Sequence, residues 1–256
     1  GQSITYDAIG NPTSYRGKTM SWNGRELESL TQNGSTITYK YDSNGMRTSK
    51  TVAGVKTEYY YSDGKLLYEA SGNKQLYYTY DAYGVLSRIY YKVGNTGTYY
   101  YPGVNSRGDV EYIYNFEGFA LTRYIYDSWG NIIEIQNEND SANHIGNVNS
   151  VRYRGYYWDE ETELYYVGSR YYDPEVGRFI NPDDVGLLGA TGDIASFNLY
   201  AYCGNNPVMN VDPSGHFFFS AFAAALLIGI GVGAAFGAGF SLVGALAEGE
   251  TGLDLF

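Results

Sequence analysis

The sequence is poor in the residues on which most metal sites, disulfides and catalytic relays depend. It has one cysteine, two histidines and six prolines among 256 residues. The single Cys203 excludes an internal disulfide, which fits either a reducing compartment or an exported protein poor in cysteine. With so few His and Cys side chains, no His/Cys metal set and no Ser-His-Asp relay can be assembled. We therefore expect no metal and no cofactor.

Basic residues are also scarce, because 17 Lys and Arg stand against 28 Asp and Glu and give a net charge of −11. Binding of phosphate backbones needs basic side chains clustered on one face, so we expect no nucleic-acid partner. Residues 1–6 carry no signal peptide and begin within a strand-like pattern. The chain reads as a fragment of a longer protein, so a missing signal says little about location.

Tyrosine and glycine, by contrast, are abundant, with 30 and 33 copies. Tyrosine favours strands and glycine favours tight turns, so together they predict an all-β protein built from many short hairpins. Tyrosine also offers a sheet two kinds of contact, since its ring packs on one face while its hydroxyl forms hydrogen bonds at the rim.

A short unit recurs, in the order aromatic, any residue, aromatic, Asp, two residues, Gly. Alternate aromatics point to one face of a strand, and an Asp-first, Gly-fourth segment predicts a tight turn, so each unit is expected to be a hairpin. The spacing is about twenty residues where the repeat is clearest, which predicts stacked units in a long curved sheet wound into a spiral. A compact β-sandwich is the alternative. The clear copies are 39–45, 78–84 and 124–130, and the looser ones are 6–10, 59–64 and 112–118.

These turns resemble the YD repeats of the Rhs family, which includes the shell subunits of Tc toxins and, more distantly, the teneurins. A more specific match to the Rhs-associated core lies in residues 150–216. Two departures from the family pattern stand out: Glu163 replaces the usual Gly, and Asp184 replaces the usual Pro. The matching motifs are Arg-Tyr-Arg-Gly (152–155), Ser-Arg-Tyr-Tyr-Asp-Pro (169–174), Gly-Arg-Phe-Ile-Asn-Pro-Asp (177–183) and Asp-Pro-Ser-Gly-His (212–216).

The resemblance implies three parts: a YD-repeat β-shell segment (1–149), an inward-turning core plug (150–216), and a hydrophobic Gly/Ala-rich helical tail (217–256) that starts a variable region. It implies a structural shell that encapsulates the chain's own C-terminal toxin or cargo segment and is continued by upstream repeats of the same chain. The protein is expected to be a secreted, cell-surface or cell-wall associated bacterial protein.

The resemblance further implies that the chain cuts itself after His216, at the His216–Phe217 bond, without activity on external substrates. The residues that match the catalytic motif are Asp183 and Asp212, with Arg178 in support. Two close carboxyl groups can divide the work of activating water and donating a proton, because their mutual repulsion lets one keep its proton. Alternatively, both acids belong to ordinary turns.

The tail differs in composition from the rest. Residues 217–247 contain no charged residue and no Pro, and this length exceeds the roughly 20 residues that a membrane-spanning helix needs. Small residues at every fourth position predict a glycine-zipper helix face and membrane contact through 217–247. A helix buried inside the shell is the alternative. The residues of this face include Ala225, Gly229, Gly233 and Gly237.

Two other functions stay open. The repeats could form a passive cell-surface or cell-wall adhesion module that binds carbohydrate through tyrosines, or a repeat protein anchored by its tail. His144 follows a polar stretch, 137–143, and is expected to lie in a solvated loop.

Overall fold

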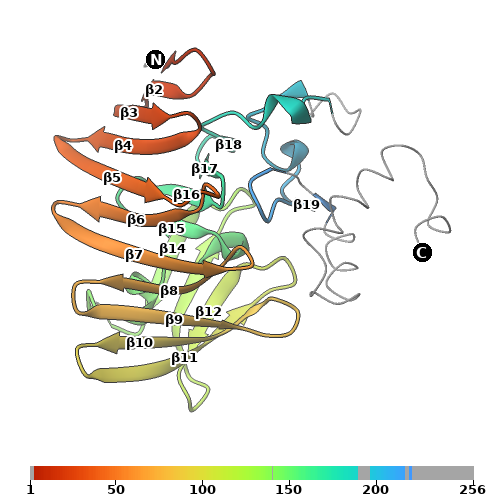
Figure 1. The fold of residues 1–256 in the computed structure, drawn as a ribbon. Helices are drawn as coiled ribbons and strands as arrows, with labels where there is room; N and C mark the ends of the chain where they lie inside the picture. Colours follow the sequence, from red (N-terminus) through yellow and green to blue (C-terminus); the bar gives the residue numbers. More distant parts are fainter. Residues whose placement is uncertain (1–2, 140, 190–196, 217–218, 221–256) are drawn as a thin grey trace.

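The structure is a computed structural model that describes residues 3–139, 141–189, 197–216 and 219–220. The predicted all-β architecture is confirmed. Its main feature is one 14-stranded sheet in which each strand pairs with its neighbours in the sequence (Figure 1). The strands are β1 (Thr5–Tyr6), β2 (Pro12–Tyr15), β3 (Lys18–Asn23), β4 (Glu26–Gln32), β5 (Ser35–Tyr41), β6 (Arg47–Val52), β7 (Val55–Ser62), β8 (Lys65–Ser71), β9 (Lys74–Tyr80), β10 (Leu86–Val93), β11 (Thr96–Val104), β12 (Val110–Tyr114), β13 (Ala120–Tyr126) and β14 (Ile132–Asn137).

Six connections between these strands share one turn, in which Asp or Asn comes first and Gly fourth. Oδ1 of Asp42 accepts the backbone N–H groups of Asn44 (2.8 Å) and Met46 (3.0 Å). Gly45 donates its N–H to the carbonyl of Asp42 (3.1 Å) and has a φ of 76°, which favours glycine. The predicted Asp-first, Gly-fourth turn is confirmed. The other five turns begin at Asp7, Asp81, Asn105, Asn115 and Asp127.

The looser copy at 59–64 turns differently. Here β7 and β8 are joined through Asp63 and Gly64, whose φ angles of 49° and 71° are both positive. Two positive φ angles in a two-residue loop match the right-handed twist of the flanking strands. Asp63 is therefore part of a tighter hairpin and does not cap a longer turn.

A second layer is formed by the segment 150–189 with 197–216, which we call the inner segment. It contains a four-stranded antiparallel sheet whose strands are almost wholly buried against the large sheet (Figure 1). This placement agrees with the expected inward turn of the chain. The elements after β14 are α1 (Ile145–Val148), η1 (Tyr153–Gly155), β15 (Tyr157–Asp159), β16 (Leu164–Val167), β17 (Arg170–Asp173), β18 (Arg178–Phe179), η2 (Val185–Leu187), η4 (Cys203–Asn205), β19 (Asn210–Val211) and β20 (Phe219–Ser220).

Tyrosines of the inner segment bind the turns of the large sheet. The hydroxyls of Tyr153, Tyr165 and Tyr172 donate to carbonyls of the turn 127–130, at 2.8, 2.9 and 2.7 Å. Each ring is buried while its hydroxyl satisfies a backbone acceptor, so tyrosine fills the interface without leaving a carbonyl unpaired. The same two-sided use of tyrosine explains part of its abundance.

On the other face of the sheet, tyrosines form a ladder of directly opposed cross-strand neighbours over β7 to β11. Tyr90 pairs with both Tyr77 and Tyr99, with ring centroids 5.9 and 4.6 Å apart. Gly97 leaves room for the ring of Tyr90, because a Cβ there would lie 2.2 Å from the hydroxyl oxygen. The ladder consists of Tyr60, Tyr68, Tyr77, Tyr90 and Tyr99.

Candidate functional site

Asp183 and Asp212 lie far apart in the sequence but share one guanidinium. Asp183 follows β18, where its backbone N–H donates to the carbonyl of Leu199 (3.0 Å), and Asp212 directly follows β19. Both acids are buried, with 6% and 2% exposure. Nη2 of Arg170 lies 2.8 Å from Oδ2 of Asp183 and 3.4 Å from Oδ2 of Asp212. The fold thus brings the two predicted carboxylates together through a buried arginine.

The carboxyl group of Asp212 closes the turn that follows it. Its Oδ1 accepts the backbone N–H groups of Gly215 (2.9 Å) and His216 (3.2 Å). Burial raises the pKa of Asp212 to about 6, against the opposing effects of Arg170 and the Gly215 N–H. A proton is therefore present on this carboxyl group over part of the mildly acidic range, where an ordinary Asp is fully ionised.

Arg170 is the residue that organises this site, and the sequence did not single it out. Besides the two acids, its Nε donates to the carbonyl of Gly215 and its Nη1 to that of Leu199 (2.9 Å). Its guanidinium carbon lies 3.6 Å from the centroid of the Phe179 ring. Arg178 was the expected supporting arginine, but its side chain donates to the carbonyl of Gly177 (3.0 Å), whereas the ion pairs with the two carboxylates come from Arg170.

Residues outside the turn 212–216 also bind it. Ser169 donates its hydroxyl to the carbonyls of Ser214 and Gly215, both at 3.0 Å. Gly215 has a φ of 76°, and a Cβ on it would lie 2.2 Å from the carbonyl oxygen of Val167. Only glycine fits this position, so the close approach of backbone to backbone fixes the chain immediately before His216.

His216 is the last described residue before the expected cut. Its Nδ1 lies 2.8 Å from Oδ1 of Asp183, and 39% of its side chain is exposed. The chain is described again at β20, which pairs with β19 in an antiparallel bridge. Phe217 lies outside the described residues, as do the expected zipper positions Ala225, Gly229, Gly233 and Gly237.

His144 departs from its expected place in a solvated loop. It is 8% exposed, and its Nδ1 accepts the backbone N–H of Gly146 (3.2 Å), which caps the start of α1. Burial lowers the pKa of His144. The polar stretch 137–143 predicted a solvated loop and gave no sign of this helix cap. Capping needs only one side-chain acceptor before the helix, and sequence composition does not reveal it.

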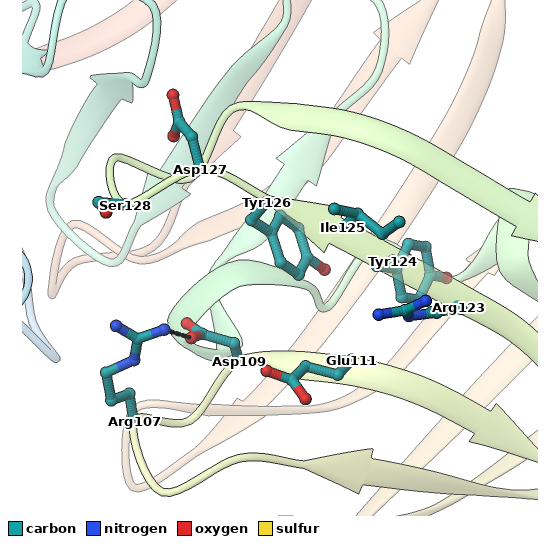
Figure 2. A pocket seen from close by; sticks show the side chains of 9 residues that line it. All are labelled: Arg107, Asp109, Glu111, Arg123, Tyr124, Ile125, Tyr126, Asp127 and Ser128. Atoms are coloured by element: carbon teal, nitrogen blue, oxygen red, sulfur yellow. Dashed lines mark ion pairs between the residues drawn. The ribbon is translucent and has the colours of Figure 1, made fainter.

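A polar hollow of about 210 Å³ opens between the turn 105–108 and β13 (Figure 2). Three of its charged side chains already have partners. Arg107 lies 3.4 Å from Asp109, which also accepts the backbone N–H of Arg154 (3.1 Å), and Glu111 accepts from the side chain of Asn105 (2.7 Å). The bond from Arg154 ties the inner segment to the residue just before β12, so we assign the hollow a structural role.

Over the part of the chain that the structure describes, no three His, Cys, Asp or Glu side chains gather closely enough to hold a metal ion. Among the same residues, no helix has the length and apolar character needed to cross a bilayer. The stretch 217–247, for which membrane contact was expected, lies outside them except for β20.

Comparison with curated proteins finds nucleases. The chain is 40% identical over 223 residues to the tRNA3(Ser)-specific nuclease WapA of Bacillus spizizenii and to the tRNA nuclease WapA of Bacillus subtilis. It is 30% identical over 220 residues to Salivary gland surface protein 1 of Aedes aegypti. Each nuclease match covers 84% of this chain but 9% of the relative, so the chain spans under a tenth of their length. No family model matches the chain.

These relatives correct the function expected from the sequence. A purely structural shell, and the alternative of a passive adhesion or carbohydrate-binding module, are both wrong as descriptions of what such proteins do, because the relatives are named for cutting tRNA. The sequence carries no sign of this activity for a simple reason. The chain matches 9% of each nuclease, so the residues that cut tRNA need not lie in the matched segment.

Solved structures show the fold. Crystal structures of TcdB2-TccC3-Cdc42 and of TcdB2-TccC3-TEV superpose with a TM-score of 0.65, at 24% and 23% identity, over 87% and 82% of this chain and 11% of the other. The Photorhabdus luminescens Tc holotoxin pore gives 0.62 at 22% identity, over 82% of this chain and 10% of the other. The chain therefore has an Rhs-related fold of the kind found in Tc toxin chains.

Proposed function

We propose that this chain is a segment of an exported bacterial toxin that cleaves tRNA, and that the segment processes the toxin by cutting its own chain after His216. The identity of 40% over 223 residues to two WapA nucleases supports the first part. The Tyr-Asp turns and the motifs of 150–216 support membership of the Rhs/YD-repeat family, with the Rhs-associated core at 150–216 and a variable region from 217. A secreted or surface location follows from this assignment.

The observation that carries the second part is the shared guanidinium. Arg170 contacts both buried carboxylates and also the carbonyl of Gly215, one residue before the proposed cut. A site that holds its own chain at the reacting position converts the reaction into an intramolecular one, which favours cutting even by modest catalytic groups.

The chemistry is hydrolysis of one peptide bond. Asp183 accepts a proton from water, whose oxygen adds to the carbonyl carbon of His216. Asp212, which holds a proton more readily than an ordinary Asp, donates it as the C–N bond breaks. The water oxygen remains in the new carboxylate of His216, and the protons end on the new amine of Phe217. Arg170 stabilises the negative charge that develops between the two acids.

This segment is not proposed to bind the tRNA itself. Its 28 acidic residues exceed its 17 basic ones, which disfavours a phosphate backbone. The uncharged stretch 217–247 is proposed to contact membrane during delivery, and liposome flotation of the full chain with and without these residues tests that point. Equal flotation of the two would remove the membrane contact and leave the rest.

The test of self-cutting is the mass of the full chain after cell-free synthesis. We expect two pieces, the second starting with Phe217, and one intact mass for Asp183→Asn, Asp212→Asn and Arg170→Met. Asp184→Asn and Arg178→Met are matched controls, because Asp184 caps Gly186 (2.8 Å) and Arg178 bonds the carbonyl of Gly177. Cutting that persists in both aspartate variants would overturn the proposal.

The toxin assignment has its own test. Total tRNA from target cells exposed to the full-length toxin should be cleaved, and the Asp212→Asn toxin should cleave less if processing precedes action. Intact tRNA after exposure to the wild-type toxin would contradict the assignment without touching the self-cutting result.

A further inference from the structure

The side chain of His216 takes part in the candidate site. Its Nδ1 lies 2.8 Å from Oδ1 of Asp183, while its backbone N–H lies 3.2 Å from Oδ1 of Asp212. The residue whose carbonyl would be attacked therefore touches both carboxylates with two different atoms. An aliphatic side chain at this position would have no atom that could make the first contact.

The surroundings of Asp183 indicate which partner donates in its hydrogen bond with His216. Asp183 already accepts the backbone N–H of Asp184 (2.8 Å) at Oδ1 and the guanidinium of Arg170 at Oδ2. The proposed base must be a carboxylate, which only accepts hydrogen bonds, so this contact requires the His216 tautomer that carries its proton on Nδ1. Hydrogen bonds to ionised groups are about twice as strong as neutral ones.

Backbone contacts fix the chain through the N–H of His216, which bonds Asp212, and through the peptide groups of Gly215. Ser169 and Arg170 hold its carbonyl, and its own N–H bonds Asp212. Beyond that point, the position of the His216 carbonyl carbon depends on rotation about the N–Cα bond of His216. Two anchors on one residue, at the backbone N–H and at Nδ1, restrain that rotation and so hold the carbonyl carbon in place.

We propose that His216 is a positioning residue for its own cleavage: the imidazole docks on Asp183 and holds the His216 carbonyl in place for attack by water. This inference rests on the proposed self-cutting. In this chain the imidazole of His216 is then part of the site, because it makes the contact with Asp183 that holds its own residue.

The test compares His216→Leu with His216→Asn in the full chain, by following the fraction cut with time during pulsed cell-free synthesis. We expect the Leu variant to be slower by about ten- to a hundredfold, because one hydrogen bond to a charged group is lost. The Asn variant should stay within about threefold of wild type, because its amide N–H sits where Nδ1 does. Because the side chain of His216 is exposed, its replacement should not disturb folding. Slow cutting by these variants would therefore not be explained by misfolding.

The outcomes separate the two proposals. A wild-type chain that stays whole removes both. If wild type is cut and Asp212→Asn is not, but His216→Leu cuts at the wild-type rate, only the positioning role falls. An Asn variant as slow as the Leu variant also overturns it.

A second readout does not depend on cutting. The Asp212→Asn chain stays whole, and its amide oxygen can still accept the N–H groups of the turn. Since the chain has two histidines, His144→Asn assigns their imidazole NMR signals. We expect a slowly exchanging N–H on His216 that is lost on further Asp183→Ala substitution. A signal unchanged by that substitution would exclude the docking contact.

Discussion

Arg47 and Asp159 form an ion pair in which neither side chain has any exposed surface, although 112 residues separate them in the sequence. Arg47 belongs to β6 of the large sheet and Asp159 to β15 of the inner segment. The guanidinium also lies within 4.9 Å of the ring centroids of Tyr59, Tyr157 and Tyr166. The pair therefore joins the two layers at a site that water does not reach, inside a cage of aromatic rings.

Removal of either partner should be costly, because the other charge would stay buried without compensation. We expect Arg47→Met and Asp159→Asn each to lower the free energy of unfolding by about 3–5 kcal/mol, measured by urea denaturation. Lys56→Met is the control, since its ion pair with Glu58 is exposed, and it should change stability little. Equal effects of the buried and the exposed substitution would contradict this view.

The same pair predicts an acid-dependent loss of stability. Burial alone would raise the pKa of Asp159, but Arg47 and Lys50 outweigh burial and hold it below its usual value. A lowered folded-state pKa stabilises the fold above the unfolded value of about 3.9, and this contribution disappears as the pH falls through the folded value. We expect the free energy of unfolding to decrease below about pH 4, and to depend less on pH in Asp159→Asn.

The rate of self-cutting should also depend on pH, but in a less acidic range than the stability does. The pKa of Asp212, raised to about 6 by burial, means that its proton is lost as the pH passes from about 5 to 7. If Asp212 is the acid, the rate of cutting falls as the pH rises through this range. Time courses at several pH values check this, with Asp184→Asn as a variant of unchanged profile. A rate that climbs through pH 6 would assign the acid role to another group.

The shared turn can be tested at one copy. We expect Asp42→Ala to cost about 1–2 kcal/mol of unfolding free energy, because the N–H groups of Asn44 and Met46 lose their acceptor. Asp42→Asn should cost little, since Asn105 and Asn115 make the same turn elsewhere. Thermal denaturation of the variants measures both, and equal losses for Ala and Asn would show that the charge matters more than the hydrogen bonds.

The outer tyrosine ladder predicts a coupled pair of substitutions. Gly97→Ala should cost about 1–3 kcal/mol, because the new Cβ meets the ring of Tyr90. In a Tyr90→Ala background the same change should cost much less, which a double-mutant cycle in urea detects. Additive effects would mean that Gly97 is required for its backbone and not for the space above it.

The parts of the fold that sequence predicts are those decided within a few residues. Asp42 and Gly45 form their turn with neighbours at most four positions away, and the alternation of Tyr39 and Tyr41 places their rings on one face. Local chemistry of this kind repeats along the sheet. It therefore gives the all-β class and the hairpins before any coordinates are known.

The parts that sequence does not predict are decided by partners far along the chain. Arg170 stands in a motif rich in aromatics, and nothing near it shows that it bridges Asp183 and Asp212. Arg178 lies closer to Asp183 in sequence, but it donates to the carbonyl of Gly177. Glu163 adopts a φ of 57°, a conformation that favours the Gly expected there, so a local rule is overridden by the fold. Such choices depend on packing between the layers.

The order of strands in the large sheet has a consequence for how such chains change over time. Because every strand of β1 to β14 pairs with its sequence neighbours, each connection closes a short loop at small entropic cost. A duplication or deletion of one complete strand pair would leave all other pairings intact, as in arrays whose units interact only with the next one. Genes of this kind can therefore gain or lose length in whole hairpins wherever the contacts with the inner segment, such as the Arg47–Asp159 pair, are kept.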